Sequence, residues 1–146
     1  MIEQHIMFIR HGETVANQEH IAHGQRDSLL NDRGQEQARS IGKRLLNWPI
    51  PYHRIVSSPL SRARNTAELI NRALHLPLNT DPGLIECDLG DWEGISYEEL
   101  GKHRYAERSI ADDHFAEHNG ESPAVISARL SHTIERLRCL HPTDNI

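Results

Sequence analysis

Cysteine is scarce in this chain of 146 residues, which contains only Cys87 and Cys139. Two cysteines make neither a disulfide framework nor a zinc-binding pattern, so we expect a protein of the reducing cytoplasm. The 11 histidines show no HExxH spacing and no CxxC partner. We therefore interpret most of them as surface residues rather than metal ligands.

Long apolar runs and long basic runs are missing as well. No stretch approaches the length of a membrane span, and the N-terminus lacks the basic start and long apolar middle of a signal peptide. The net charge is −5, and without clustered lysine and arginine a nucleic acid is not an expected partner. The length fits a single domain, residues 1–146, with a core of its own.

Short apolar runs alternate with amphipathic segments along the chain. The runs 6–9 and 54–58 predict buried strands, and 76–79 predicts a short edge strand. Amphipathic spacing predicts long helices at residues 31–46, 61–74 and 122–141. Their start signals are Asn31 as an N-cap and the Ser122-Pro123 pair. This order of elements indicates an α/β fold with a parallel sheet.

Two polar stretches are expected to lie outside these long elements. Residues 15–30 are too long and too polar for a simple turn, and loops of this kind are usually functional or mobile. Ser96 opens a capping-box pattern, which predicts a short helix. Residues 102–120 are charged and weakly periodic, which predicts a surface excursion that is helical in part.

The first apolar run ends in Arg10, His11 and Gly12. In open α/β sheets the chemistry lies just beyond the carboxyl ends of such strands. Gly12 lets the backbone turn and approach a ligand closely, and Arg10 offers a planar fork of donors for a phosphate or carboxylate. These residues predict an anion site, and the alternative is a strand end whose polar residues only meet water.

The stretch Arg10-His11-Gly12-Glu13-Thr14 resembles the signature of the histidine phosphatase superfamily, the phosphoglycerate-mutase-like proteins. Later stretches agree with that family in order and spacing: Leu30-Asn31 with Gly34, Gln37 and Ala38; Ser57-Ser58-Pro59-Leu60 with Arg62-Ala63 and Thr66-Ala67; Leu84-Ile85-Glu86 with Gly90-Asp91-Trp92-Glu93-Gly94; and Gly120-Glu121-Ser122 with Arg129. The resemblance covers nearly the whole chain. It implies a three-layer sandwich, in which helices flank a mainly parallel central sheet.

The resemblance implies that His11 is the nucleophile, which attacks phosphorus as a neutral imidazole and carries a transient phosphoryl group. Arg10 and Arg62 would grip the phosphate, because fixed cations stabilise the charge that spreads over the transferring oxygens. The reaction needs no metal and no cofactor. The alternative for Arg62 is an ordinary exposed helix arginine.

Three further residues would contact the substrate: Asn17, His23 and Gly24. Asn17 would donate a hydrogen bond to the phosphate, and its alternative is an Asx turn that stabilises the loop. His23, with Gly24 behind it, occupies a place where the family often has a polar residue that lines the pocket. Its alternative is a surface loop histidine.

Glu86 would donate the proton to the leaving oxygen, which requires burial or a like charge to raise its pKa. Asp88 is the other candidate for the acid, and the alternative for Glu86 is a solvated surface carboxylate without a catalytic role. Trp92 is expected to pack under this loop rather than to stack on a substrate. Glu13 is expected to brace its own loop rather than to react.

The sequence departs from the family pattern at its end. Family members carry a second histidine in a Ser-His-Gly turn, after an apolar strand that lies between the first and second strands of the sheet. Here Ile146 would begin that strand. We therefore expect the chain to lack the C-terminal strands and the second histidine. Each hydrogen bond left unmade along a buried strand would cost about 1–3 kcal/mol.

The expected activity is the hydrolysis of a phosphomonoester, a small phosphorylated metabolite, through a phosphohistidine on His11. A phosphatase is favoured over a mutase because the segment after Glu86 is short. Mutase-type phosphoryl transfer, a non-catalytic phosphate-binding relative and a metal-dependent hydrolase stay open as alternatives. A homodimer is a further option, since a partner chain would be one source of the missing strand.

Overall fold

The computed structural model describes residues 4–146. Its helices are α1 (Val15–Gln18), α2 (Asp32–Leu46), α3 (Ser61–Leu74), α4 (Tyr97–Lys102), α5 (Tyr105–Ala111) and α6 (Pro123–Leu140). Its strands are β1 (Ile55–Ser57) and β2 (Leu78–Thr80), and the 3₁₀ turns η1 (Pro82–Leu84) and η2 (Gly90–Trp92) follow β2. The long helices that amphipathic spacing predicted are confirmed.

Side-chain caps begin the helices where the sequence predicts them. The Asn31 side chain accepts from the Gly34 N–H at 2.8 Å at the start of α2. The Ser96 hydroxyl accepts from the Glu99 N–H at 3.1 Å at the start of α4. Ser122 caps α6, with a proline in the first turn. These local signals hold because each cap satisfies an N–H group that has no partner inside its helix.

The two strands β1 and β2 run parallel, with Ile55 opposite Leu78 and Ser57 opposite Thr80. Helix α3 makes the crossover between them, as parallel strands require. The α/β class is therefore confirmed. Within the described residues, however, the sheet contains only these two strands.

The prediction of a buried strand at residues 6–9 is wrong for this structure. The stretch belongs to no strand, and the side chains of Phe8 and Ile9 are 71 % and 39 % exposed. Only its beginning is paired: Met7 N–H donates to the Ile146 carbonyl at 2.8 Å, and Ile146 N–H donates to the His5 carbonyl at 3.0 Å. A strand needs a ladder partner along its length, and this one has a partner at one residue.

The segment 15–30 also differs from the expected loop, because it opens with the single helical turn α1. Thr14 and Asn17 cap this turn reciprocally: the Thr14 hydroxyl accepts from the Asn17 N–H, and the Asn17 side chain accepts from the Thr14 N–H. The pattern is a capping box with asparagine in place of the usual Glu or Gln. Because Asn17 stands where the pattern expects Glu or Gln, the sequence did not reveal this capping box.

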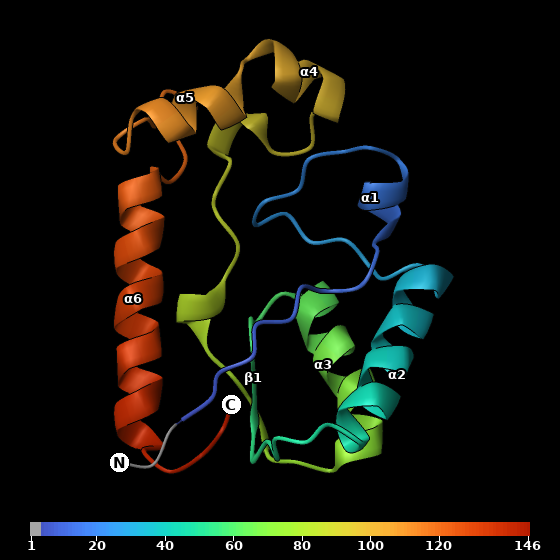
Figure 1. Cartoon of the computed structure of the whole chain (residues 1–146). Coiled ribbons are helices and arrows are strands. Elements are labelled where there is room, and N and C mark those ends of the chain that lie inside the picture. Colours follow the sequence, from blue (N-terminus) through green and yellow to red (C-terminus); the bar gives the residue numbers. More distant parts are fainter. Residues whose placement is uncertain (1–3) are drawn as a thin grey trace.

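The helices lie on two sides of β1, with α2 and α3 on one side and α6 on the other (Figure 1). The core cluster lies on the α2–α3 side and consists of Leu30, Ala38, Leu69 and Ile70. Helix α2 approaches α3 closely at Gly42, where an added Cβ would lie 2.7 Å from the Ile70 carbonyl oxygen. Helices α4 and α5 lie at one end of the molecule, and residue 146 lies at the other (Figure 1).

Helix α6 is attached to the rest of the molecule through arginine side chains. Arg129 pairs with Glu121 and donates to the carbonyls of Gly83 and Ile85 at 2.9 and 2.7 Å. Two turns further on, Arg136 pairs with the buried Asp81. Among residues 4–146, no helix combines the length and apolar character that crossing a membrane requires.

Candidate active site

The loop that carries His11 is held by α2 and α3. The Gly12 N–H donates to the Thr66 hydroxyl of α3 at 3.0 Å. An added Cβ on Gly12 would lie 2.3 Å from the Gly34 carbonyl oxygen in the first turn of α2. Only glycine permits this approach, so Gly12 places the neighbouring His11 against both helices.

The hydrogen bonding of His11 defines its tautomer. Its Nδ1 lies 2.7 Å from the Gly12 carbonyl oxygen. A carbonyl only accepts, so Nδ1 carries the proton and Nε2 keeps a lone pair when this bond is made. Partial burial lowers the pKa of His11; the Gly12 bond opposes this, and Arg62, Arg10 and His23 lower it further. The ring therefore favours the neutral form, which a nucleophile requires.

Arg62 lies in the first turn of α3, and its side chain is buried, with the residue only 1 % exposed. Its guanidinium donates to the carbonyls of Arg26, His23 and Gly24, at 3.0, 3.2 and 2.5 Å. Asp27 lies 3.7 Å away and also accepts from the Ser61 N–H, which starts α3. The alternative of an exposed helix arginine is wrong, since Arg62 fastens loop 23–27 to α3.

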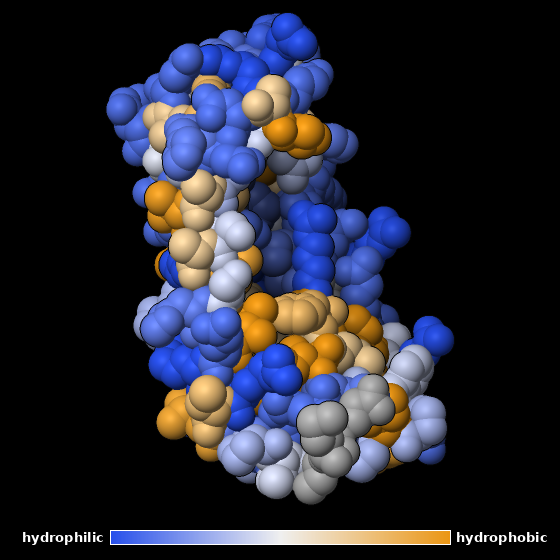
Figure 2. Space-filling model, turned by 60° about the vertical axis from the view of Figure 1, so that its left-hand side comes forward, coloured by the Kyte–Doolittle hydropathy of each residue, from blue (hydrophilic) through white to orange (hydrophobic). Residues whose placement is uncertain are grey.

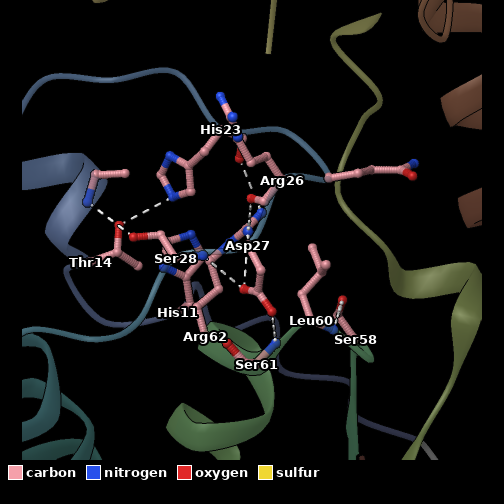
Figure 3. Close-up of polar contacts among 12 residues, drawn as sticks. His11, Thr14, His23, Arg26, Asp27, Ser28, Ser58, Leu60, Ser61 and Arg62 are labelled. Carbon is pink, nitrogen blue, oxygen red and sulfur yellow. Dashed lines mark hydrogen bonds and ion pairs between the residues drawn. The ribbon is translucent and has the colours of Figure 1, made fainter. Parts of the chain in front are cut away.

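His23 projects from this loop toward His11, and Figure 3 shows both imidazoles near Arg62. The ring centroids of His11 and His23 are 6.1 Å apart. The His23 Nδ1 lies 3.2 Å from the Ile21 carbonyl oxygen, and its Nε2 lies 3.2 Å from the Thr14 hydroxyl. Burial lowers the pKa of His23 as well. Its orientation is therefore set by its own loop and by the cap of α1.

Asn17 and Gly24 serve the architecture of the loop in this structure. The Asn17 amide accepts from Thr14 and donates to the Tyr97 hydroxyl at 3.0 Å, as the loop-stabilising alternative expects. Gly24 is buried, and an added Cβ would lie 2.2 Å from the Cys87 carbonyl oxygen. The loops that carry His23 and Glu86 thus meet at a glycine.

Glu86 is exposed, and one carboxylate oxygen accepts from the Cys87 N–H at 2.9 Å. The burial that its role as an acid requires is not present here. The rival Asp88 accepts from the Gly90 N–H within its own turn at 2.8 Å. Next to Glu86, burial raises the pKa of the Cys87 thiol to about 11, so this thiol stays protonated.

Four of the predicted site residues line one cavity of about 540 Å³: Arg10, His11, Arg62 and Glu86. Arg10 is exposed at its edge. Asn17, His23 and Gly24 are not part of the cavity wall, although His23 and Gly24 bind Arg62 through their carbonyls. Within residues 4–146 no cluster of His, Cys, Asp and Glu is arranged to hold a metal ion.

Two other predicted side chains have structural contacts. Trp92 stacks between His103 and His118, with ring centroids 4.5 and 5.0 Å apart, which agrees with a packing role. Glu13 accepts from the Asn31 side chain at 2.8 Å and thereby braces its loop. The motifs included Thr14 and Thr66 but assigned no contact to them or to Asp27, because these contacts become visible only once the loops are packed together.

The fold and the site define a class of protein. The model of the histidine phosphatase superfamily (branch 1) matches residues 6–146. The chain therefore belongs to the histidine phosphatase superfamily, as its motifs predicted.

The relatives named for this family include phosphatases and a mutase. The chain is 42 % identical over 99 residues to "Uncharacterized phosphatase PhoE" of Bacillus subtilis (strain 168), which covers 66 % of this chain and 49 % of that protein. It is 34 % identical over 130 residues to "Probable phosphoglycerate mutase GpmB" of Salmonella arizonae, and the match covers 86 % of this chain and 59 % of that protein. The chain thus spans about half to three fifths of the length of these curated relatives.

Solved structures show the same fold. A mycobacterial glucosyl-3-phosphoglycerate phosphatase, solved with VO3, is 32 % identical with a TM-score of 0.80, covering 92 % of this chain and 65 % of that one. Bacillus stearothermophilus YhfR is 29 % identical with a TM-score of 0.80, and the match covers 97 % of this chain and 70 % of that one. The α/β fold of histidine phosphatases is therefore present in this chain.

Proposed function

We propose that His11 is the nucleophile of a phosphomonoesterase that acts on a small phosphorylated metabolite. The His11 Nε2 lone pair forms a bond to phosphorus while the bond from phosphorus to the leaving oxygen breaks. Glu86 gives its proton to that oxygen, and water then hydrolyses the phosphohistidine. The observation that carries the proposal is the Nδ1 bond to Gly12, which leaves Nε2 unprotonated.

The two arginines have different parts in binding the phosphate. Arg62 has five N–H donors, three of which bind backbone carbonyls, so two remain for phosphate oxygens. Because it is held by its own chain, its charge is placed before the substrate arrives. Arg10 is exposed at the cavity edge and adjusts to the ligand.

Hydrolysis of p-nitrophenyl phosphate by the purified chain tests the nucleophile. We expect His11→Ala to reduce the rate by at least about a thousandfold, and the exposed His132→Ala of α6 to leave it unchanged. Alkali-quenched ³¹P NMR should show a phosphohistidine signal in the parent chain only. An equal rate in the parent and His11→Ala chains would contradict the proposal.

The role of Glu86 is tested by leaving groups of different basicity. Glu86→Gln should slow an alkyl phosphate by about a hundredfold and p-nitrophenyl phosphate much less. Asp88→Asn is the matched control and should affect neither ester. Equal slowing of both esters by Glu86→Gln would remove Glu86 from the acid role.

A phosphatase is favoured over a mutase because the segment after Glu86 is short. With 3-phosphoglycerate as the probe, a phosphatase releases inorganic phosphate, whereas a mutase returns 2-phosphoglycerate. EDTA should leave the rate unchanged, since the proposed reaction uses no metal. These measurements also test the proposed metabolite class directly.

A non-catalytic phosphate-binding protein is the second candidate. It is favoured by the exposure of Glu86, which lacks the burial that an acid in this role requires. Titration calorimetry with inorganic phosphate separates the two functions. Binding that is lost in Arg62→Met, together with background hydrolysis in the parent chain, would support binding without catalysis.

A further inference from the structure

The cavity beside His11 has two ends of different character. One end is an apolar groove between residues 5–10 and strand β1, and its lining includes Ala67 of α3 and Leu130 of α6. Figure 2 shows hydrophobic residues gathered at the bottom of a hollow in this face of the molecule. Arg62 lies at the other end, and its position depends on the polar groups of that end.

Glu93 directly follows η2, and its carboxylate accepts three backbone N–H groups from two loops. Its Oε1 accepts from Gln25 at 2.8 Å and from Leu89 at 3.1 Å, and its Oε2 accepts from Arg26 at 3.1 Å. The carboxylate also lies directly against Gly24, where an added Cβ would be 2.5 Å from Oε1. Hydrogen bonds to an ionised acceptor are stronger than neutral ones, so Glu93 holds the two loops together.

The bond to Gln25 links Glu93 to Arg62 through a single peptide group. The N–H of Gln25 and the C=O of Gly24 belong to the same planar trans unit, so they point in opposite directions. The N–H donates to Glu93, and the C=O accepts from Nη2 of Arg62 at 2.5 Å. A carboxylate on one side of a peptide polarises it and strengthens the bond on the other side. Glu93 therefore orients and strengthens a contact that holds the guanidinium.

The other terminal nitrogen of Arg62 is linked to Glu93 as well. Arg26 donates its N–H to Glu93, and its carbonyl accepts from Nη1 of Arg62 at 3.0 Å. Nη2 also donates to the His23 carbonyl at 3.2 Å, so both of its hydrogens are bound. The carboxylate and the guanidinium thus hold the same short loop from two sides.

We propose that Glu93 is a positioning residue, which fixes the Arg62 guanidinium through the peptide group between Gly24 and Gln25. The inference rests on the proposed function, in which Arg62 binds the transferring phosphoryl group. Glu93 does not line the cavity, so it acts through Arg62 and not on the substrate. The N–H donors of Arg62 that bind no carbonyl are held in place before the substrate arrives, and such preorganised donors stabilise developing charge.

The first test measures kcat/KM for p-nitrophenyl phosphate in two variants of Glu93. Glu93→Ala removes all three acceptors and should lower kcat/KM about a hundredfold. Glu93→Gln restores a neutral acceptor but places an amide N–H₂ group, which cannot accept, at one of the two oxygen positions. It should lower kcat/KM about tenfold. The matched control is Glu99→Ala of α4, whose carboxylate pairs with the exposed Lys102, and it should act like the parent.

The Glu93 variants should remain folded, because backbone bonds also join the two loops. The Ala22 N–H donates to the Ile95 carbonyl, and the Gly94 N–H donates to the Ala22 carbonyl, both at 2.8 Å. Circular dichroism checks the fold of each variant. A double-mutant cycle then separates action through Arg62 from a general loosening of the site. In an Arg62→Lys background, Glu93→Ala should lower kcat/KM less than about threefold, and equal losses in both backgrounds would overturn the proposal.

NMR gives a readout that needs no turnover. Both Nη2 hydrogens of Arg62 bind carbonyls in the parent chain, so slow rotation should give separate Nη–H signals. These signals should merge in Glu93→Ala and stay separate in Glu99→Ala. Merged signals in the parent, or separate ones in Glu93→Ala, would overturn the proposal.

The same measurements distinguish failure of this inference from failure of the proposed function. A parent chain that neither hydrolyses p-nitrophenyl phosphate nor binds inorganic phosphate overturns the proposed function, and the role of Glu93 in it falls as well. An active parent chain whose Glu93→Ala variant is equally active overturns the inference alone.

Discussion

The two ends of the cavity beside His11 differ in how their polar groups are satisfied. At the phosphate end, the buried Arg62 binds three carbonyls of loop 23–27, and Gly12 binds Thr66. At the groove end, the backbone of Val56 faces an open space and Phe8 is largely exposed. The end at Arg62, for which we propose phosphate binding, is therefore built by polar contacts within the described chain, whereas the groove end beside β1 is lined mainly by apolar side chains.

The groove is nevertheless held open at a defined width. Helix α6 is fastened through Arg129 to the carbonyls of Gly83 and Ile85, at one end of the groove. Polar contacts thus hold an apolar helix face in place without direct packing on β1. The loops around His11 and Arg62 are held by hydrogen bonds to α3 and to loop 23–27, although the sheet has only β1 and β2 among the described residues.

The largest effect is expected at the phosphate end. Arg62→Met should lower the free energy of unfolding by about 4 kcal/mol, because it leaves one buried and two partly buried carbonyls without their donor. The control is Arg64→Met on the same helix, whose pair with Glu68 is half exposed and should contribute about 0.5 kcal/mol or less. Urea unfolding measures both, and similar losses would refute the special role of Arg62.

The attachment of α6 is the next test. Arg129→Met removes the Glu121 pair and two carbonyl bonds, which should cost about 3 kcal/mol of unfolding free energy. Arg138→Met, near the exposed end of α6, should change it by less than about 0.5 kcal/mol. If thermal unfolding shows the same midpoint for both variants, α6 is held by its apolar face rather than by Arg129.

A smaller effect concerns the pH dependence of the phosphate end. Burial lowers the pKa of His11 below 6.5, so the folded protein binds this proton less tightly than the unfolded chain does. Stability from this residue is therefore complete above pH 6.5 and is lost as pH falls below it. NMR titration of the His11 ring should give a midpoint below 6.5, and a midpoint above it would contradict the neutral nucleophile.

The smallest effect is expected at the groove end. Phe8→Ala should change the free energy of unfolding by about 0.5 kcal/mol or less, because the ring is 71 % exposed. Ile70→Ala in the core cluster is the comparison and should cost about 3 kcal/mol.

The helices could be predicted closely from the sequence. Asn31 and Ser122 cap their helices as predicted, and the bounds of α3 follow from its apolar spacing. These features depend on residues within a few positions of one another, so local chemistry is sufficient. The resemblance to the family grouped Arg10, His11, Arg62 and Glu86 in one site, and in the structure all four line one cavity.

Other features could not be predicted because they depend on contacts between distant segments. The sequence does not show that Arg62 donates to the carbonyls of residues 23, 24 and 26. Nor does it show that the side-chain amide of Asn17 forms hydrogen bonds with Thr14 and Tyr97. The prediction of a strand at residues 6–9 was wrong because it also depended on a contact with a distant segment. Its apolar composition permits a strand, but composition supplies no hydrogen-bonding neighbour.

The sequence by itself determined the family and the long helices, since these follow from local patterns and from motif spacing. The tertiary structure decided the tautomer of His11, the burial of Arg62 and the exposure of Phe8. Each of these depends on which groups from distant segments satisfy one another, and a buried donor or carbonyl finds its partner only when the chain is packed.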